Sequence, residues 1–234
     1  MNIFDILQII TALVVLYIGI TVFLKNQTGS NNIFFFLITI CAFIWILTIY
    51  FLWNSKQKET AVFLGNLAFL GPALIPSFLV HFSFNFPEKK GKIGFIWNLI
   101  IGLPAFLFSL MIPLKLIISD VKVASWGNEL KPGLGYVPFI VYFLFYSSMA
   151  FYFLMRKYFK EDLNERAKHQ ILYVVSGFSL TIFLAAVTNL IIPLVLGIGY
   201  SYRIGPSFTI IAALFTQLRP NIFLILTCSS IISL

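Results

Sequence analysis

The sequence predicts an all-α, polytopic membrane protein with seven transmembrane helices, and three observations lead to this fold class. First, 60% of the 234 residues are hydrophobic and only 10% are charged, and the mean hydropathy is +0.97. A soluble globular protein cannot cover so much apolar surface with polar residues. Second, the apolar residues fall into seven runs, each long enough to span a bilayer with about 20 residues. Third, short polar connectors separate these runs, so residues 1–234 form one membrane domain.

The first three runs differ in their proline content. The runs at about 3–24 and 33–53 are ordinary spans that end in short polar turns. The third run, at about 61–86, contains Pro72 and Pro76. Because proline lacks a backbone N–H and removes a helical hydrogen bond, we expect this helix to be kinked or locally unwound.

The fourth and fifth runs lie on either side of the longest connection. The fourth extends over about 93–118, and the fifth, at about 136–159, is unusually aromatic. The connection between them reads ISDVKVASWGNELKPGLG. Its many turn-forming residues predict a loop.

The sixth run, at about 170–197, follows the most charged connector of the chain, KEDLNERAKHQ, and the seventh run extends over about 205–230. Asn189 is the strongly polar residue inside the sixth run, and Pro193 follows four positions later. Pro193 cannot donate to the carbonyl of Asn189, so we expect a bend with a free carbonyl at this point. Two interpretations stay open: a structural kink, or a ligand site formed by the free carbonyl and the amide beside it.

Basic residues near the ends of the spans predict the orientation. Ten of the sixteen Lys and Arg residues fall on one side of the membrane and six on the other. The side with the excess faces the cytoplasm under the positive-inside rule. The N-terminus is therefore expected outside, and the C-terminus in the cytoplasm, of a bacterial inner membrane. The residues that contribute most to this assignment are Lys89, Lys90, Lys92, Arg156, Lys157, Lys160, Arg166 and Lys168.

Residues suited to catalysis or metal binding are scarce. All eight carboxylates lie in loops or near span ends, so no buried acidic pair is available for acid/base work. His81, near the expected cytoplasmic end of the third run, has no second ligand nearby, which favours an interfacial histidine over a metal or proton site. The sequence has no phosphate loop and no nucleophile motif. We expect no enzyme, no metal and no cofactor.

The net charge of +8 does not indicate nucleic acid, because the basic residues are scattered among short connectors and form no basic motif. The expected partners are the lipid bilayer, a second copy of the chain in a homodimer, and an unidentified small-molecule or membrane signal.

Four segments, taken in order, resemble a known family. HFSFNFPEKK closes the third run, NERAKHQILYVVSGF enters the sixth, TNLIIP lies within it, and YRIGPSFTIIAAL opens the seventh. Together they resemble the N-terminal seven-transmembrane region of bacterial sensor histidine kinases, over nearly all of the chain. The resemblance implies a membrane module that senses a signal and passes it to cytoplasmic output modules, often a PAS domain followed by kinase domains. It also implies that these residues carry no phosphotransfer themselves.

The expected mechanism combines this resemblance with the bend. A helix displacement at the bend would bias the cytoplasmic end of the seventh span. A small transporter or channel is the alternative, but seven spans do not divide into two equal repeats, and no charge inside the spans marks an ion path. The candidate hinge or ligand-contacting residues are Asn189, Pro193, Arg203 and His81.

The last segment of the chain departs from the resembling family. There the seventh span continues into a cytoplasmic exit, whereas here Thr216 is followed by QLRPNIFLILTCSSIISL, which stays apolar. Reading the codons from two nucleotides into that of Thr216 permits the residues of the family's exit. A frameshifted tail is therefore expected, with a natural end or a truncation left open, and the coding DNA distinguishes them.

Overall fold

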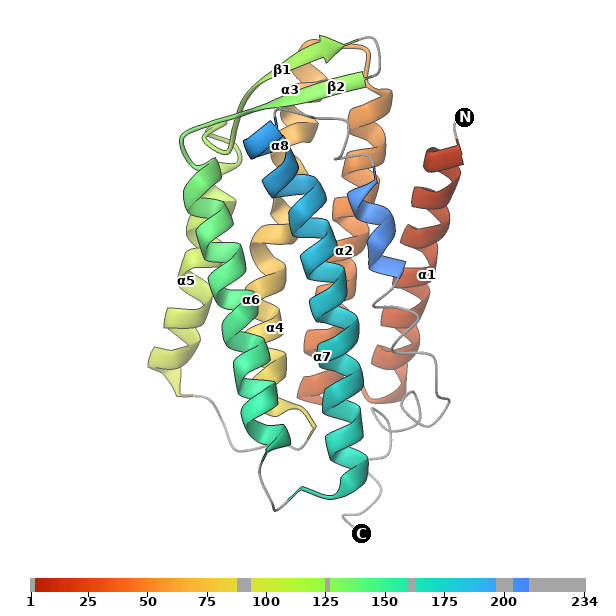
Figure 1. Ribbon diagram of the computed structural model, residues 1–234, viewed down its shortest axis with the longest axis vertical. Coiled ribbons are helices and arrows are strands. Elements are labelled where there is room, and N and C mark those ends of the chain that lie inside the picture. The colour runs from red at the N-terminus through yellow and green to blue at the C-terminus, as the bar shows by residue number, and fades with distance from the viewer. Residues whose placement is uncertain (1–2, 88–93, 125–126, 160–162, 197–203, 211–234) are drawn as a thin grey trace.

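The computed structural model describes residues 3–87, 94–124, 127–159, 163–196 and 204–210 (Figure 1). Its long helices stand side by side in a bundle, and a small β-hairpin covers the end of the bundle at which the N-terminus lies. Within the described residues, five helical segments are long and apolar enough to cross a membrane, and Phe95–Met111 is a shorter apolar helix. Most of the expected seventh span, 205–230, lies outside the described residues.

Helices α1 (Ile3–Lys25) and α2 (Ser30–Asn54) form an antiparallel pair joined by a short turn. The side-chain amide of Asn32 donates to the Val22 carbonyl over 2.8 Å, which satisfies a carbonyl near the end of α1. The rings of Phe23 and Phe36 stack beside this bond with their centroids 4.7 Å apart. The turn therefore holds the two helices together through polar and aromatic contacts at one end of the pair.

The third apolar run forms two helices, α3 (Lys58–Leu67) and α4 (Leu70–Asn85), with a turn at Ala68 and Phe69. Pro72 has no N–H to donate to the Ala68 carbonyl, which explains why the helix is interrupted here. Local unwinding is what the prolines in this run led us to expect.

Helix α5 (Phe95–Met111) is shorter than the expected run of 93–118. Pro113 cannot donate to the Ser109 carbonyl, and Lys115 adopts a left-handed φ of 53°, so the helix cannot continue through this stretch.

The expected loop between the fourth and fifth runs is a β-hairpin, which corrects the prediction. Strands β1 (Ile118–Ala124) and β2 (Gly127–Pro132) pair antiparallel, with Val121 opposite Leu130. From Asp120 to Val123, branched residues alternate with polar ones along β1, as a half-buried strand requires. The fold is therefore mostly helical with one hairpin.

Two asparagine side chains fix the hairpin to the helices. Asn66 of α3 donates to the Ile118 carbonyl over 2.8 Å and accepts from the Ile118 N–H over 3.1 Å, as a neighbouring strand would. Asn128 of β2 donates to the carbonyls of Leu52 and Ser55 at the end of α2, over 2.7 and 2.8 Å. These four bonds satisfy buried backbone groups of both the strand and the helix ends.

Helix α6 (Tyr136–Tyr158) leads to the charged connector, and α7 (Glu165–Ala186) begins earlier than the expected 170. The side chain of Asn164 caps α7 by accepting from the Ala167 N–H over 2.7 Å, so part of the connector is helical. Next come the π-helical segment η1 (Val187–Ile191), α8 (Ile192–Leu196) and, later in the chain, the short 3₁₀ helix η3 (Gly205–Phe208).

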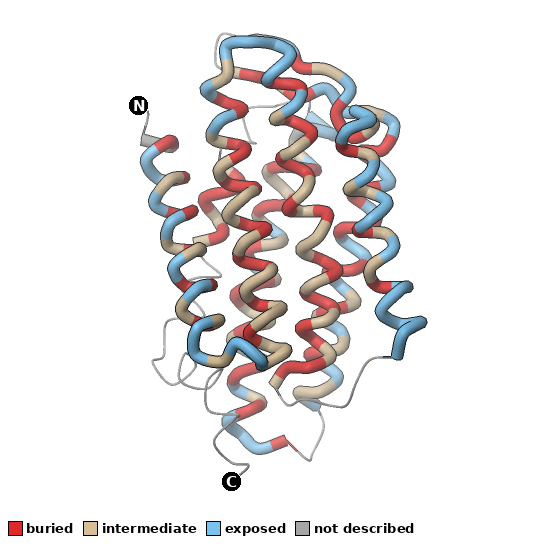
Figure 2. The backbone as a smooth tube through the Cα atoms, turned by 180° about the vertical axis from the view of Figure 1, so that it is seen from behind, coloured by how far each residue is buried: buried red, intermediate tan, exposed pale blue. Residues whose placement is uncertain are grey.

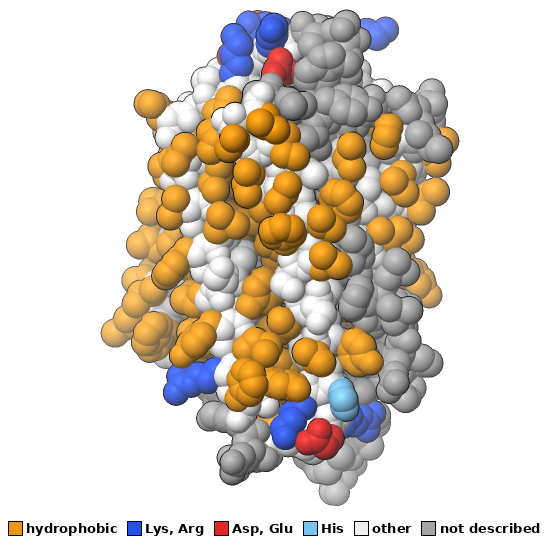
Figure 3. Space-filling model, viewed as in Figure 1, with side chains coloured by type: hydrophobic (Ala, Val, Ile, Leu, Met, Phe, Trp, Pro, Cys, Tyr) orange, Lys and Arg blue, Asp and Glu red, His pale blue; other side chains and the backbone are white. Residues whose placement is uncertain are grey.

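Buried residues line the faces that the helices turn toward one another, and exposed residues lie on the outer faces (Figure 2). Large apolar side chains such as Phe95, Phe145 and Val141 are among those exposed. Figure 3 shows that hydrophobic side chains cover the middle of the visible face, while Lys, Arg and acidic side chains gather at its two ends. An apolar belt between charged ends is the surface expected of a bundle embedded in a lipid bilayer.

Candidate functional site

Where the sequence predicts a bend in the sixth span, the structure has the π-helical segment η1, which joins α7 to α8. The N–H of Ile192 bonds to the Val187 carbonyl, five residues earlier, as in a π-helix. Such single-turn π segments occur frequently at functional sites. Pro193 lies just beyond, in α8, and has no N–H for the carbonyl of Asn189.

The carbonyl that Pro193 frees is bound by a neighbouring helix. The hydroxyl of Tyr136, in the first turn of α6, donates to the Asn189 carbonyl over 3.0 Å and reaches the Leu190 carbonyl at 3.4 Å. The Tyr136 side chain is fully buried, so water does not compete for this bond. Of the two interpretations left open by the sequence, the geometry thus gives the free carbonyl a structural partner.

The side chain of Asn189 is held differently from its backbone. Its amide nitrogen donates to the Ala185 carbonyl over 2.9 Å and to the Thr188 hydroxyl over 3.1 Å. Its oxygen is buried and has no hydrogen-bond partner within the part of the chain that the structure describes. Gly205 of η3 packs directly against this amide, and a Cβ at Gly205 would overlap it. Substitution at Gly205 would therefore displace Asn189.

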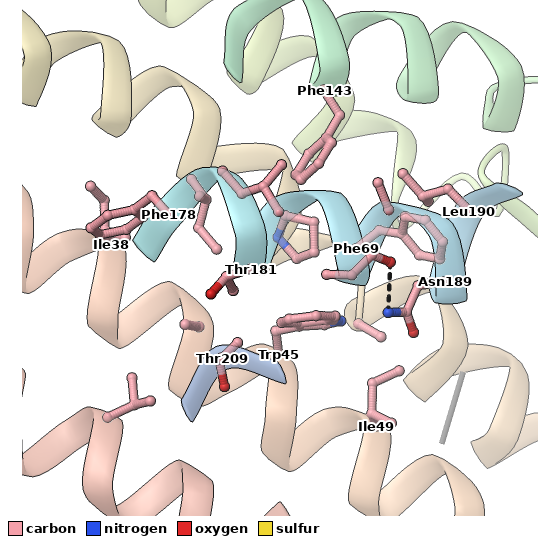
Figure 4. A pocket seen from close by; sticks show the side chains of 18 of the residues that line it. Ile38, Trp45, Ile49, Phe69, Phe143, Phe178, Thr181, Asn189, Leu190 and Thr209 are labelled. Atoms are coloured by element: carbon pink, nitrogen blue, oxygen red, sulfur yellow. Dashed lines mark hydrogen bonds between the residues drawn. The ribbon is translucent and has the colours of Figure 1, made fainter. Parts of the chain in front are cut away.

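The Asn189 side chain lines a cavity of about 110 Å³ in the middle of the bundle (Figure 4). Side chains from α1, α2, α4, α6 and α7 surround it, and Trp45 of α2 and Phe69 beside α4 form part of its wall. Leu130 of β2 also lines it, so the hairpin forms part of the cavity wall. The cavity, the π segment and the hairpin therefore form one continuous region.

The four candidate hinge or ligand residues do not all meet at this cavity. Asn189 lines it, and Pro193 is in α8, with its side chain outside the described part. Arg203 also lies outside the described residues. His81 is elsewhere on α4, where its ring stacks on Phe34 with centroids 4.9 Å apart, and it is not among the lining residues.

Neither Tyr136 nor Leu130 is predicted by the sequence to be part of the site. Each acts through a contact with a segment more than fifty residues away along the chain. Tyr136 begins an aromatic span and is indistinguishable in sequence from its neighbours. Leu130 could have been found only by recognising the strand pattern of the hairpin.

Among the residues expected to set the topology, Lys157 has a second role. Its ammonium group donates to the carbonyls of Ser83, Phe84 and Phe86, each over 2.8 Å, and so caps the C-terminus of α4. Of the other residues expected to set the topology, some are described by the structure and some are not. Arg156, Arg166 and Lys168 lie at the same end of the bundle, whereas Lys89, Lys90, Lys92 and Lys160 lie outside the described residues.

The family model of the N-terminal 7TM region of histidine kinase matches residues 7–226. A comparison with curated proteins found no match. The matched stretch covers nearly the whole chain and contains the hairpin, the cavity and the π segment. It confirms the resemblance carried by the four sequence segments, and with the apolar helices it makes this a multi-pass membrane protein. The chain therefore belongs to the family of N-terminal seven-transmembrane regions of histidine kinases.

Proposed function

We propose that this chain is the membrane-embedded sensory input module of a histidine kinase-type signalling protein, in which the signal alters the bend at η1. The family match supports the first part, because that family is a sensory region and not a catalytic domain. The observation that carries the second part is the bond from Tyr136 to the Asn189 carbonyl, which links the bend to α6.

A π segment is a suitable element for a two-state switch. Returning it to α-helical bonding would move the residues that follow by one position, which is about 100° of rotation and 1.5 Å of rise. Pro193 opposes that return, because the Asn189 carbonyl would still have no helical donor. A signal that binds one arrangement better than the other would shift the balance between the two.

Helix α6 connects the π segment η1 to the opposite end of the bundle. Tyr136 contacts the bend from the first turn of α6, and Lys157, near the last turn of the same helix, binds three carbonyls at the end of α4. A displacement of α6 along its axis would therefore move the C-terminal end of α4, at the end of the bundle away from the hairpin. We propose that this end faces the cytoplasmic output modules in the bacterial inner membrane.

The test is a chimera in which this chain, up to the end of the family match at residue 226, replaces the membrane region of a histidine kinase of the same family. Autophosphorylation is measured in membrane vesicles. Pro193→Ala and Asn189→Leu should each change the rate while insertion stays intact. Pro104→Ala, in the interior of α5 and outside the cavity, is the matched control and should leave the rate unchanged. If both bend variants behave like the control, the hinge is not part of signalling.

A further inference from the structure

The orientation of the Asn189 amide is fixed by its partners. Its nitrogen faces the carbonyl of Ala185, and only the nitrogen can face a carbonyl, since the side-chain oxygen has no hydrogen to donate. The Thr188 hydroxyl donates to the Leu184 carbonyl over 2.8 Å and so accepts from the same nitrogen. The Asn189 oxygen must therefore turn away from its own helix. In Figure 4 the oxygen points to the side of Ile49, which belongs to the cavity wall.

Asn189 is 7% exposed as a residue, and its side-chain oxygen is buried. Among the described residues that line the cavity, this oxygen is the buried side-chain acceptor without a partner. The threonine hydroxyls of the wall do not donate to the Asn189 oxygen, because each donates to a backbone carbonyl: Thr39 to Phe36, Thr181 to Phe208 and Thr209 to Pro206. A buried acceptor left without a donor costs free energy. A ligand that brings a donor would recover that free energy.

The rest of the cavity wall favours an apolar molecule. Apart from the amide and the hydroxyls, it consists of hydrocarbon and aromatic side chains, including Phe35, Phe139 and Phe178. An engineered apolar cavity of about 150 Å³ holds a benzene ring. A cavity of about 110 Å³ therefore fits a molecule of about one small ring and excludes a complete lipid tail.

We propose that this cavity binds a small, mainly apolar molecule with one hydrogen-bond donor, a hydroxyl or an N–H, which donates to the side-chain oxygen of Asn189. The site itself is independent of signalling. Only the identification of this ligand as the signal rests on the proposed function. Because Asn189 belongs to η1, a donor bound there contacts the bend directly.

Phenol and toluene make a matched pair of probes, because they have nearly the same shape and only phenol carries a donor. The full chain is labelled with 5-fluorotryptophan, reconstituted in lipid nanodiscs and followed by ¹⁹F NMR during titration. Trp45 lines the cavity and reports binding there. Trp97, on α5 and 59% exposed, reports simple partitioning into the lipid.

We expect phenol to shift the Trp45 resonance saturably, at about one tenth of the concentration that toluene needs, which corresponds to one hydrogen bond. Asn189→Leu should abolish the difference between the two probes. Asn98→Leu, at an exposed asparagine on α5 that does not line the cavity, is the control and should preserve it. Ala42→Leu, which places three more carbons in the wall, should remove the response to both probes.

Equal responses to phenol and toluene in the unmodified chain would overturn the assignment of Asn189 as acceptor. Parallel, unsaturable shifts of Trp45 and Trp97 would mean that the probes only enter the lipid, and would overturn the site. A saturable Trp45 response that persists in Ala42→Leu would also overturn the site, and this test does not rely on the Asn189 variant.

The kinase chimera separates this inference from the proposed function. If phenol binds at Trp45 and autophosphorylation does not change, the site stands and its role as signal receptor fails. If the bend variants change autophosphorylation while phenol does not bind, the sensory function stands and the ligand class is wrong.

Discussion

The hydroxyl of Tyr136 donates to the backbone carbonyl of Asn189 over 3.0 Å, and this is the carbonyl that Pro193 leaves without a helical donor. Both groups are buried, so the bond is made in a region without competing water. The π segment therefore does not depend on its own helix for every backbone bond. One of its carbonyls is bound by α6 instead.

Replacing Tyr136 by Phe removes the donor and leaves the Asn189 carbonyl buried and unpaired. We expect the free energy of unfolding to fall by about 1–3 kcal/mol, measured by denaturation in mixed detergent micelles. Tyr142→Phe is the matched control, since the Tyr142 hydroxyl donates to the Ala73 carbonyl, which lies inside α4 and has a helical donor as well. Loss of the Tyr142 hydroxyl should lower the free energy of unfolding by less. Equal costs for the two variants would show that the bend does not rely on α6.

Lys157→Met keeps the length of the side chain and removes the charge that caps α4. We expect the last turn of α4 to fray, because three carbonyls lose a charged donor at once. The amide of Phe86, which bonds to the Phe82 carbonyl, should exchange its hydrogen faster in deuterated buffer. Arg156→Met, at the exposed neighbouring position, is the control. If the Phe86 amide exchanges its hydrogen equally slowly in Lys157→Met, Lys157 does not cap α4.

The elements that the sequence predicts well depend on local chemistry. The interruption before Pro72 and the π segment before Pro193 both lie where a proline lacks the N–H that would bond to the carbonyl four residues earlier. The elements that it misses depend on contacts over long distances in the chain. Lys157 is interpreted as a topology signal, because no residue near it in the sequence indicates that the carbonyls of Ser83 to Phe86 lie beside it.

The hairpin shows a different kind of limit. The residues of β1 have a strand pattern, but they are followed by glycine and proline, which are equally typical of a loop. The deciding interactions come from Asn66 and Asn128, which pair with backbone groups of other segments. Asn66 lies inside an apolar run, and its partner is the backbone of a strand.

Asn66→Leu should release the hairpin from α3. The Ile118 N–H and carbonyl would both lose their partner in a buried position, which costs about 1–3 kcal/mol for each unpaired group. We expect faster hydrogen exchange at Ile118 and a wider cavity, because Leu130 of the same hairpin is part of the cavity wall. The control is Asn54→Leu, whose side chain is exposed and bonds within α2. Unchanged exchange at Ile118 would mean that Asn66 does not anchor the hairpin.

The carboxylate of Asp120 makes the hairpin sensitive to acid. The hydrogen bond from Lys58, followed by that from the Val121 N–H, lowers the pKa of Asp120 below its ordinary value. Since the folded pKa is the lower one, the ion pair contributes stability above the pKa of the unfolded chain. That contribution is lost as pH falls through the folded pKa.

An NMR titration of the Val121 amide, which bonds to the Asp120 carboxylate over 2.8 Å, measures this transition. Lys58→Met should move the midpoint upward, because it removes the largest cause of the lowered pKa. Lys122→Met, on the same strand and outside the ion pairs of Asp120, should leave it in place. A midpoint that does not respond to Lys58→Met would contradict the ion pair.

The orientation in the membrane is tested by reporter fusions at the two ends of the bundle. The N-terminus and the hairpin lie at one end, and the turn from α6 to α7 lies at the other (Figure 1). The excess of Lys and Arg at the latter end predicts that it faces the cytoplasm. Fusions after Lys25, after Lys90 and within Asn164–Lys168 should report as cytoplasmic, and a fusion within Gly127–Gly133 as external.

The same charges provide the control. Neutralising Arg156, Lys160, Arg166 and Lys168 to Gln removes the whole excess and should weaken the preference of the Asn164–Lys168 fusion. Lys157 is left intact, because its role as a cap of α4 would confound the result. If the unmodified fusion before α7 reports as external, the cavity and the bend lie in the cytoplasmic half of the bundle. The hairpin would then face the output modules, and the proposed direction of signalling would be wrong.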